Sequence, residues 1–178
     1  MHNALLVWID LEMTGLNPVR DHILEIGCVI TDGNLNLIAQ GPQLVIHQSA
    51  TALTVMSPAV RALHEASGLL PLVAQSKVSV ADAEQQVYDF ITHHCKNNQA
   101  RLAGNTVWQD RQFLQAYMPR ILQPLHYRII DVSTVKELVL QWYPSARKYE
   151  KQNKHRVLDD IHESIAELRY YRAHYFKQ

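Results

Sequence analysis

The amino-acid sequence predicts an α/β protein in which helices flank a mixed β-sheet. Three β-prone segments come first and are joined by short turns, so they form an antiparallel meander rather than a βαβ unit. Two later strand segments alternate with amphipathic helical segments, an order typical of an α/β sandwich. Of the 178 residues, 47% are hydrophobic and 19% charged, which excludes a disordered chain and predicts one domain over 1–178.

The first three strands are predicted at 5–13, 23–31 and 35–47. The first two segments read LLVWIDLEM and ILEIGCVIT, apolar runs that suit buried strands. The turn residues from Thr14 to Pro18 close the first strand. A hairpin signal at Asp32-Gly33 separates the second from the third, in which Gly41-Pro42 predicts a kink.

The rest of the chain alternates helices with two strands, predicted at 102–106 and 127–132. One helix follows a capping-box-like start at Ser79 and Asp82, another ends at Pro119, and a third spans 134–142 with Thr134 and Glu137 as its capping box. The polar, basic segment 145–154 is predicted to be a mobile loop before a long final helix. The apolar positions of these four helices are Val80, Ala83, Val87, Phe90 and Ile91; Phe113, Leu114, Tyr117 and Met118; Val135, Leu138, Val139 and Trp142; and Leu158, Ile161, Ile165 and Leu168.

Charge and cysteine content restrict the possible partners. The 17 basic residues equal the 17 acidic residues, so no global basic field points to long nucleic acid. A nucleic-acid partner should therefore be short, or be held locally by metals and a few cations. Cys28 and Cys95 are too few for a disulfide framework or a zinc cluster. With no signal peptide before Asp10 and no membrane-spanning run, a cytoplasmic protein is expected.

Asp10 and Glu12 stand two residues apart on the first predicted strand, so their carboxylates point to the same face. Two acids inside an apolar run repel each other and are costly to desolvate, but a bound divalent cation would reverse that cost. The alternative is a strand edge exposed to water, where alternating acids are ordinary.

Three further residues add to this pair. Asp110 lies at the start of a helix, where an N-cap or first-turn acid is the alternative interpretation. His155 and Asp160 are five residues apart, or about 140° around one helix. They could share a cleft if His155 lies on the loop end and Asp160 in the first helical turn; a helix cap beside an exposed loop histidine is the alternative.

Together these residues supply four carboxylates and one histidine. Oxygen-rich sites without cysteine suit Mg²⁺ or Mn²⁺ rather than zinc. Two such ions can activate a water and stabilise the leaving oxygen of a phosphodiester, while a neighbouring imidazole accepts the proton of that water. The residues therefore predict metal-dependent phosphodiester hydrolysis.

The words around these residues resemble the oligoribonuclease family, which consists of DEDDh 3′→5′ exonucleases with an RNase H-like fold. The similar words are WIDLEMTGL (8–16), GN-x-x-x-QDR (104–111), HYR-x-x-DVST-x-KEL (126–138) and DDI-x-ESIAEL-x-YYR (159–172). The resemblance implies a homodimeric enzyme that uses two Mg²⁺ or Mn²⁺ ions to hydrolyse very short single-stranded RNA to 5′-mononucleotides. It also implies a mixed five-stranded sheet whose first three strands are antiparallel.

The resemblance further implies a role for each matching residue. Asp10 would bridge both metals, Glu12 and Asp160 would complete one site, Asp110 would serve the other mostly through water, and His155 would be the general base. Tyr127 would be an active-site residue that crosses a dimer interface; a core tyrosine is its alternative. The remaining substrate-binding candidates are Leu16, as a wedge between two bases, Thr106, and Arg128, Ser133 and Lys136, the last three around the 5′-phosphate. For Ser133 and Lys136, a helix cap and a solvated lysine are the alternatives.

Two positions depart from the family pattern. Ala59 stands where the family usually has a tryptophan that stacks on a base, and Trp108 stands where it has a small residue. Base stacking on an aromatic ring contributes about 1–3 kcal/mol, so these changes bear on substrate length rather than on the hydrolytic centre. A broader single-strand DNA or RNA exonuclease and a non-catalytic binding module on the same fold are the alternative functions.

Overall fold

A computed structural model of the chain describes residues 4–95, 99–150 and 156–176. The strands are β1 (Leu6–Met13), β2 (Ile23–Thr31), β3 (Leu37–Val45), β4 (Arg101–Gly104) and β5 (His126–Asp131). They form a five-stranded sheet in the order β3-β2-β1-β4-β5, in which β1 pairs antiparallel with β2, β2 antiparallel with β3, and β4 parallel with both β1 and β5. The predicted mixed sheet with antiparallel first strands is confirmed.

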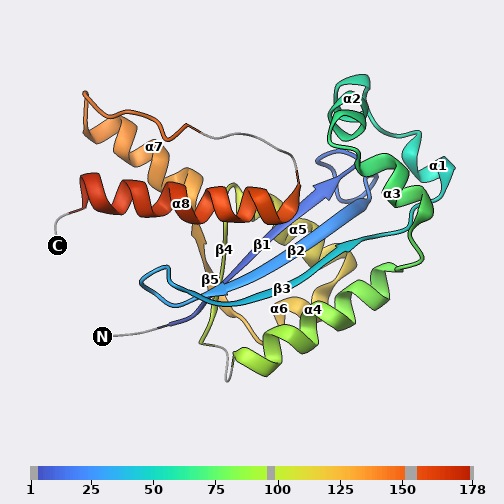
Figure 1. Cartoon of the computed structure of the whole chain (residues 1–178), viewed down its shortest axis with the longest axis horizontal. Helices are drawn as coiled ribbons and strands as arrows, with labels where there is room; N and C mark the ends of the chain where they lie inside the picture. The colour runs from blue at the N-terminus through green and yellow to red at the C-terminus, as the bar shows by residue number, and fades with distance from the viewer. Residues whose placement is uncertain (1–3, 96–98, 151–155, 177–178) are drawn as a thin grey trace.

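Helices cover both faces of this sheet (Figure 1). They are α1 (Ala50–Leu53), α2 (Pro58–Ala66), α3 (Leu69–Gln75), α4 (Val80–His94), α5 (Val107–Tyr117), α6 (Pro119–Leu122), α7 (Val132–Trp142) and α8 (Val157–Tyr175). Val7, Ile9 and Leu11 of β1 pack with α4, α5 and α6 on one face. Trp8 packs with α7 and α8 on the other. Strand β1 is therefore central and buried on both sides, except where its acidic residues lie.

Several predicted local features are confirmed. The capping box of α4 is formed, with the Asp82 amide donating to Ser79 Oγ at 3.1 Å and the Ser79 amide donating to Asp82 Oδ2 at 3.1 Å. Between the pairs Gly27–Gln43 and Val29–Gln40, β3 contains one residue more than β2, which is the irregularity expected at 41–42. Within the described residues, no helix is long and apolar enough to cross a membrane.

Two helix starts differ from the prediction. Helix α5 begins at Val107, after Thr106 with a φ of 58°, so Asp110 lies in its first turn rather than at its start. Helix α7 begins at Val132 and is capped by Asp131, whose carboxylate accepts the Ser133 amide at 3.0 Å. The predicted capping box at 134–137 is therefore wrong, and Trp142 is 65% exposed rather than buried.

The short helices α1, α2 and α3 were not predicted. They span four, nine and seven residues, too few for a clear apolar period. The signals that could have revealed α1 and α2 are Ser49 and Ser57, which cap them, together with Pro58 at the first helical position. Of the predicted loop 145–154, residues 145–150 contain neither helix nor strand, and its mobility stays a prediction.

Candidate active site

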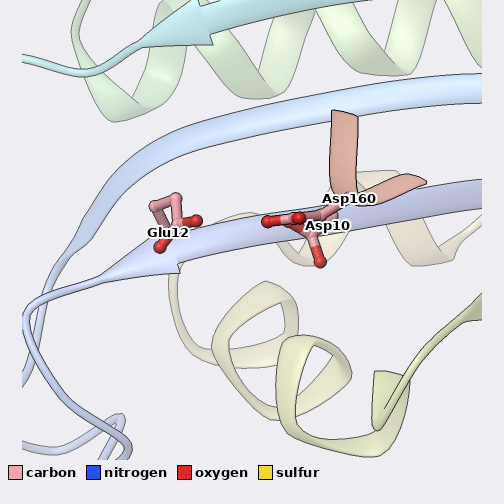
Figure 2. A group of neighbouring side chains, drawn as sticks. All are labelled: Asp10, Glu12 and Asp160. Atoms are coloured by element: carbon pink, nitrogen blue, oxygen red, sulfur yellow. The ribbon is translucent and has the colours of Figure 1, made fainter. Parts of the chain in front are cut away.

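Three carboxylates converge at the carboxyl-terminal half of β1. Asp10 and Glu12 lie on the face of β1 that carries Trp8, and Asp160 lies in the first turn of α8, which covers that face. One oxygen from each carboxylate lies within 4.8 Å of the other two (Figure 2). The predicted placement of Asp10 and Glu12 on one face, and of Asp160 in the first helical turn, is therefore observed.

Helix α8 comes this close to the sheet because Gly27 leaves room for it. Gly27 is the β2 residue directly opposite Asp10. A Cβ atom at Gly27 would lie 2.8 Å from Cγ2 of Val157 and 3.3 Å from Cδ1 of Ile161, both in the first turns of α8. The missing side chain therefore permits the approach that places Asp160 over β1.

Gly27→Ala is accordingly expected to push the start of α8 away from the sheet. Overpacking of this kind should lower the free energy of unfolding by about 1–3 kcal/mol. It should also weaken binding of Mn²⁺, measured by titration of the metal-free protein. The double variant Gly27→Ala/Val157→Ala removes the nearest atom and should recover part of both losses. If Gly27→Ala alone bound Mn²⁺ as wild type does, the close approach would not position Asp160.

Asp110 lies beside the three carboxylates, where strand pairing stops. β4 pairs with β1 only from Leu6 to Trp8, so the later amides on that edge of β1 need other acceptors. The carboxylate of Asp110 accepts the Leu11 amide at 3.0 Å and is 6% exposed. This bond fixes Asp110 against β1, although it is not part of the 4.8 Å group. Asp110 is not the helix cap, because Thr106 holds that position, but it is a first-turn acid as the alternative interpretation proposed.

For Glu12 and Asp110, the surroundings disfavour the ionised carboxylate when no cation is bound. Burial, together with the nearby carboxylates of Asp160 and Glu25, raises the pKa of Glu12 to about 8, against the guanidinium of Arg156, which lowers it. Burial also raises the pKa of Asp110, against the effect of the Leu11 amide. A bound cation would reverse this balance, because it favours ionised oxygen ligands. The donors are all carboxylate oxygens, which fits a hard divalent cation such as Mg²⁺ or Mn²⁺.

His64 is a residue of this region that the sequence did not single out. It lies in α2, is 1% exposed, and its Nε2 lies 2.8 Å from the Met13 carbonyl oxygen. A carbonyl can only accept, so Nε2 carries a proton. The Nδ1 atom lies 3.7 Å from Oε2 of Glu12. His64 therefore holds the end of β1 and faces Glu12.

Leu16 projects from the loop between β1 and β2 and is 69% exposed. Gln109, in the first turn of α5, donates from Nε2 to the Leu16 carbonyl at 2.7 Å. The same loop is held by the buried carboxylate of Asp21, which accepts the Asn17 amide at 2.9 Å. Leu16 is thus an exposed apolar side chain on a loop tied to the helix that carries Asp110.

The residues predicted around a substrate phosphate lie on and beside β5. Tyr127 is 71% exposed on this edge strand, so the alternative of a core tyrosine is wrong. The guanidinium of Arg128 lies 5.4 Å from the Tyr127 ring centre. Asp131 brings Thr106 and Ser133 together, because its Oδ1 accepts the Thr106 amide at 2.9 Å and the Ser133 hydroxyl at 2.6 Å. Since Asp131 is the cap of α7, Ser133 is not the cap residue.

One chain does not bring Tyr127 to the carboxylates. β1, β4 and β5 run parallel, and Trp8 aligns with Ala103 and then Ile130. Tyr127 therefore lies toward the amino end of β5, while Asp10 and Glu12 lie toward the carboxyl end of β1. Two strand spacings and about four residues along a strand separate Tyr127 from Asp10 by on the order of 15 Å. Lys136 is half-buried on α7; His155 lies outside the described residues.

Comparison with known proteins identifies the fold and the family. The chain is similar in fold to exonuclease I of E. coli bound to single-stranded DNA, with a TM-score of 0.76 at 15% identity over 97% of this chain. Exonuclease I of Methylocaldum szegediense gives a TM-score of 0.72 at 17% identity. This chain spans about 41% of the length of each of those chains. The RNase H-like fold predicted from the sequence is confirmed.

Sequence comparison extends over almost the whole chain. The model of the exonuclease family RNase_T matches residues 7–168. The oligoribonuclease of Marinobacter nauticus is 48% identical over 173 residues, which cover 97% of this chain and 96% of the relative. The oligoribonuclease of Klebsiella pneumoniae is 46% identical over the same share of each chain. Identity at this level across both full lengths means that the chain belongs to the oligoribonuclease family of exonucleases.

Proposed function

We propose that this chain is a 3′→5′ exoribonuclease that hydrolyses very short RNA oligonucleotides to 5′-mononucleotides with two divalent cations, Mg²⁺ or Mn²⁺. The convergence of Asp10, Glu12 and Asp160 within 4.8 Å carries the proposal. Cations bound there would supply an activated water and charge stabilisation of the leaving 3′ oxygen. Membership of the oligoribonuclease family supports RNA as the substrate.

Each of the four acids would have its own role in binding the two cations. Asp10 has an oxygen within 4.8 Å of both Glu12 and Asp160, and would be the shared ligand. Glu12 and Asp160 would complete one site. Asp110 is fixed by the Leu11 amide at 3.0 Å outside the 4.8 Å group, which suits a ligand that reaches the second cation mostly through water.

His155 is the proposed general base for the attacking water. Its neighbour Arg156 is the N-cap residue of α8, and Asp160 follows in the first turn of that helix. Changing His155 to alanine should lower the rate at saturating metal by at least about 10²-fold, the lower end for a general base. Single-turnover hydrolysis of a dinucleotide measures this step. An unchanged rate would require a different base.

Binding of the substrate is proposed to involve a second copy of the chain. Tyr127 and Arg128 are exposed on an edge strand, yet lie far from the carboxylates of their own chain. In a homodimer they could reach the site of the partner, where Arg128, Thr106, Ser133 and Lys136 would contact the 5′-phosphate. Leu16 would then separate the two bases at the carboxylate end.

Mixing two inactive variants tests the shared site. Tyr127→Ala would lack the aromatic contribution but keep its acids, and Asp110→Ala would lack a metal ligand but keep Tyr127. Each variant homodimer should be nearly inactive. A mixed dimer contains one intact composite site out of two, so it should have up to about half the activity of a wild-type dimer. No gain on mixing, with mixed dimers demonstrated by mass, would contradict a site built from two chains.

Substrate length is tested by comparing two labelled substrates. Mononucleotide release with Mg²⁺ is measured from a dinucleotide and from a long single strand, with Asp110→Ala as the control. Faster release from the dinucleotide is expected. Faster release from the long strand would favour a broader DNA or RNA exonuclease, a function that the fold similarity to DNA-bound exonuclease I makes worth testing. No release from either would leave a non-catalytic binding module.

The base pocket is where this chain should differ from its family. Ala59 is exposed on α2 and offers no ring, while Trp108 is 49% exposed in the first turn of α5, two residues before Asp110. We expect weaker binding of the base that the family tryptophan would contact. Ala59→Trp would then lower KM for the dinucleotide with little change in kcat.

A reducing compartment is also proposed. Cys28 and Cys95 are free thiols and both are buried. Burial raises the pKa of Cys95 to about 11 and that of Cys28 further, so neither is a reactive thiolate at neutral pH. These features fit a cytoplasmic enzyme, which fractionation of cells can test.

A further inference from the structure

An ion pair between the half-buried Arg156 and the buried Glu25 joins the start of α8 to the sheet beside the carboxylate cluster. Glu25 lies on β2 directly opposite Glu12, and its side chain is 0% exposed. Arg156 donates from Nε to Glu25 Oε2 at 3.1 Å and from a terminal guanidinium nitrogen to Oε1 at 2.7 Å. Gln43 of β3 donates to the same Oε1 at 2.8 Å. We call these three residues the clamp.

The clamp acts on the helical turn that carries Asp160. Arg156 is the N-cap residue of α8, and its carbonyl accepts the Asp160 amide at 3.0 Å. Arg156 is therefore bound at both ends: its backbone carbonyl is bonded to Asp160, and its guanidinium is bonded to Glu25 on β2. Gly27, two residues from Glu25 on β2, allows Val157 to pack directly against the strand. Together these contacts fix where the first turn of α8 lies on the sheet.

Stability alone does not account for the clamp. Replacing a buried ion pair with apolar residues of similar volume is often neutral or stabilising, because desolvation offsets the attraction of the charges. A bidentate guanidinium–carboxylate contact, in contrast, fixes the relative orientation of the two side chains in a way that apolar packing does not. Its place beside Asp10, Glu12 and Asp160 suggests that this geometry serves the cluster.

We infer that the Glu25–Arg156–Gln43 clamp is a positioning device for the metal site, which sets the first turn of α8 so that the Asp160 carboxylate meets those of Asp10 and Glu12. The inference rests on the proposed function for the identity of the bound cations. Arg156 is a positioning residue and not a ligand, because its charge has the same sign as that of the metal.

The substitution Arg156→Lys separates positioning from the two simpler roles. Lysine keeps the positive charge but makes a point contact in place of the bidentate contact. If Arg156 acted by charge alone, lysine would preserve metal binding. If it acted on stability alone, the melting temperature would fall while metal binding and turnover below that temperature stayed unchanged. A positioning role predicts loss of metal affinity and turnover that the retained charge does not rescue.

The experiment titrates Mn²⁺ into the metal-free protein and measures dinucleotide hydrolysis at saturating Mn²⁺, with melting temperatures in parallel. For Arg156→Lys we expect Mn²⁺ binding about 10-fold weaker and kcat lower by about 10- to 100-fold, the range seen when support around metal ligands is lost. The matched control is Arg169→Lys, because Arg169 also lies on α8 and ties it to the Leu35 carbonyl, away from the cluster. It should bind Mn²⁺ and turn over as wild type does.

Wild-type Mn²⁺ affinity in Arg156→Lys would overturn the inference. If that variant does not fold, Gln43→Ala removes one hydrogen bond from Glu25 without changing any charge, and should weaken Mn²⁺ binding in the same direction; unchanged binding would again overturn it. The titration needs no RNA, so it also separates the two proposals. A wild-type protein that binds Mn²⁺ without cleaving RNA would refute the proposed function and leave the clamp comparison valid.

Discussion

Replacing Asp110 with asparagine is expected to lower the rate of RNA hydrolysis by about 10²- to 10³-fold while stabilising the metal-free protein, since a metal contributes several kcal/mol to the transition state. Asparagine keeps an oxygen that can accept the Leu11 amide, now 3.0 Å from the carboxylate. It removes the negative charge that a second cation would need. Although the position is only 6% exposed, asparagine has nearly the same size and shape as aspartate, so the start of α5 should not change.

The gain in stability has a separate cause. Burial raises the pKa of Asp110, and the charges of Asp131 and Glu12 raise it further, so its ionised form is unfavourable in the folded protein without metal. A neutral amide avoids this and should raise the free energy of unfolding by on the order of 1 kcal/mol near pH 8.

Chemical denaturation of metal-free protein and dinucleotide hydrolysis in Mg²⁺ measure the two effects on one sample. Asp89→Asn, an exposed acid on α4, is the matched control and should change neither. A variant that lost both activity and stability would mean that Asp110 supports the fold, and its assignment to the metal site would then lack this support.

Local patterns in the sequence were sufficient for much of the site. The period of two along β1 places Asp10 and Glu12 on one face, and the apolar spacing from 158 onward sets α8 in phase so that Asp160 falls in its first turn. The bounds of β2 also agree with the prediction, because a continuous β-prone run ends at a clear turn. Each of these features depends on neighbours within a few residues.

Contacts between distant residues could not be read in this way. The bond between His64 and Met13 joins residues 51 apart, and the pair of Arg156 with Glu25 joins residues 131 apart. The prediction of where α7 starts was wrong for the same reason. Asp131 outcompetes the local capping box at 134–137 because its carboxylate also accepts the amide of Thr106, a contact between β4 and β5 ends that sequence spacing does not reveal.

Raising the pH should destabilise the metal-free protein and strengthen its binding of Mg²⁺. The pKa of Glu12 is about 8 in the folded protein, against an ordinary value of 4.5. Between those values the folded state holds a proton that the unfolded state has released, so the free energy of unfolding falls as pH rises through this window. Above about pH 8 both states are ionised and the loss is complete.

A cation binds the ionised carboxylate and must displace that proton at lower pH. Each displaced proton changes the apparent affinity about tenfold per pH unit below the pKa, so binding at pH 6 should be up to about 10²-fold weaker than at pH 8. Near saturation this difference is worth up to about 2.7 kcal/mol. For a chain of this size it corresponds to a Mg²⁺-induced rise in melting temperature that is larger at pH 8 by about 5–10 °C.

Thermal melts with and without Mg²⁺ at pH 6 and pH 8 measure this difference, with KCl matched for ionic strength so that general screening of acids is excluded. Proton release on adding Mg²⁺ at pH 7 in weak buffer should approach about one proton per chain from Glu12, with a further contribution from Asp110, whose pKa burial also raises. Equal Mg²⁺-induced shifts at the two pH values would mean that Glu12 is already ionised at pH 6. The cation would then bind carboxylates that are already ionised. In that case the repulsion among Asp10, Glu12 and Asp160 would have to be relieved within the protein itself. The guanidinium of Arg156, which lowers the pKa of Glu12, is the positive charge identified beside it.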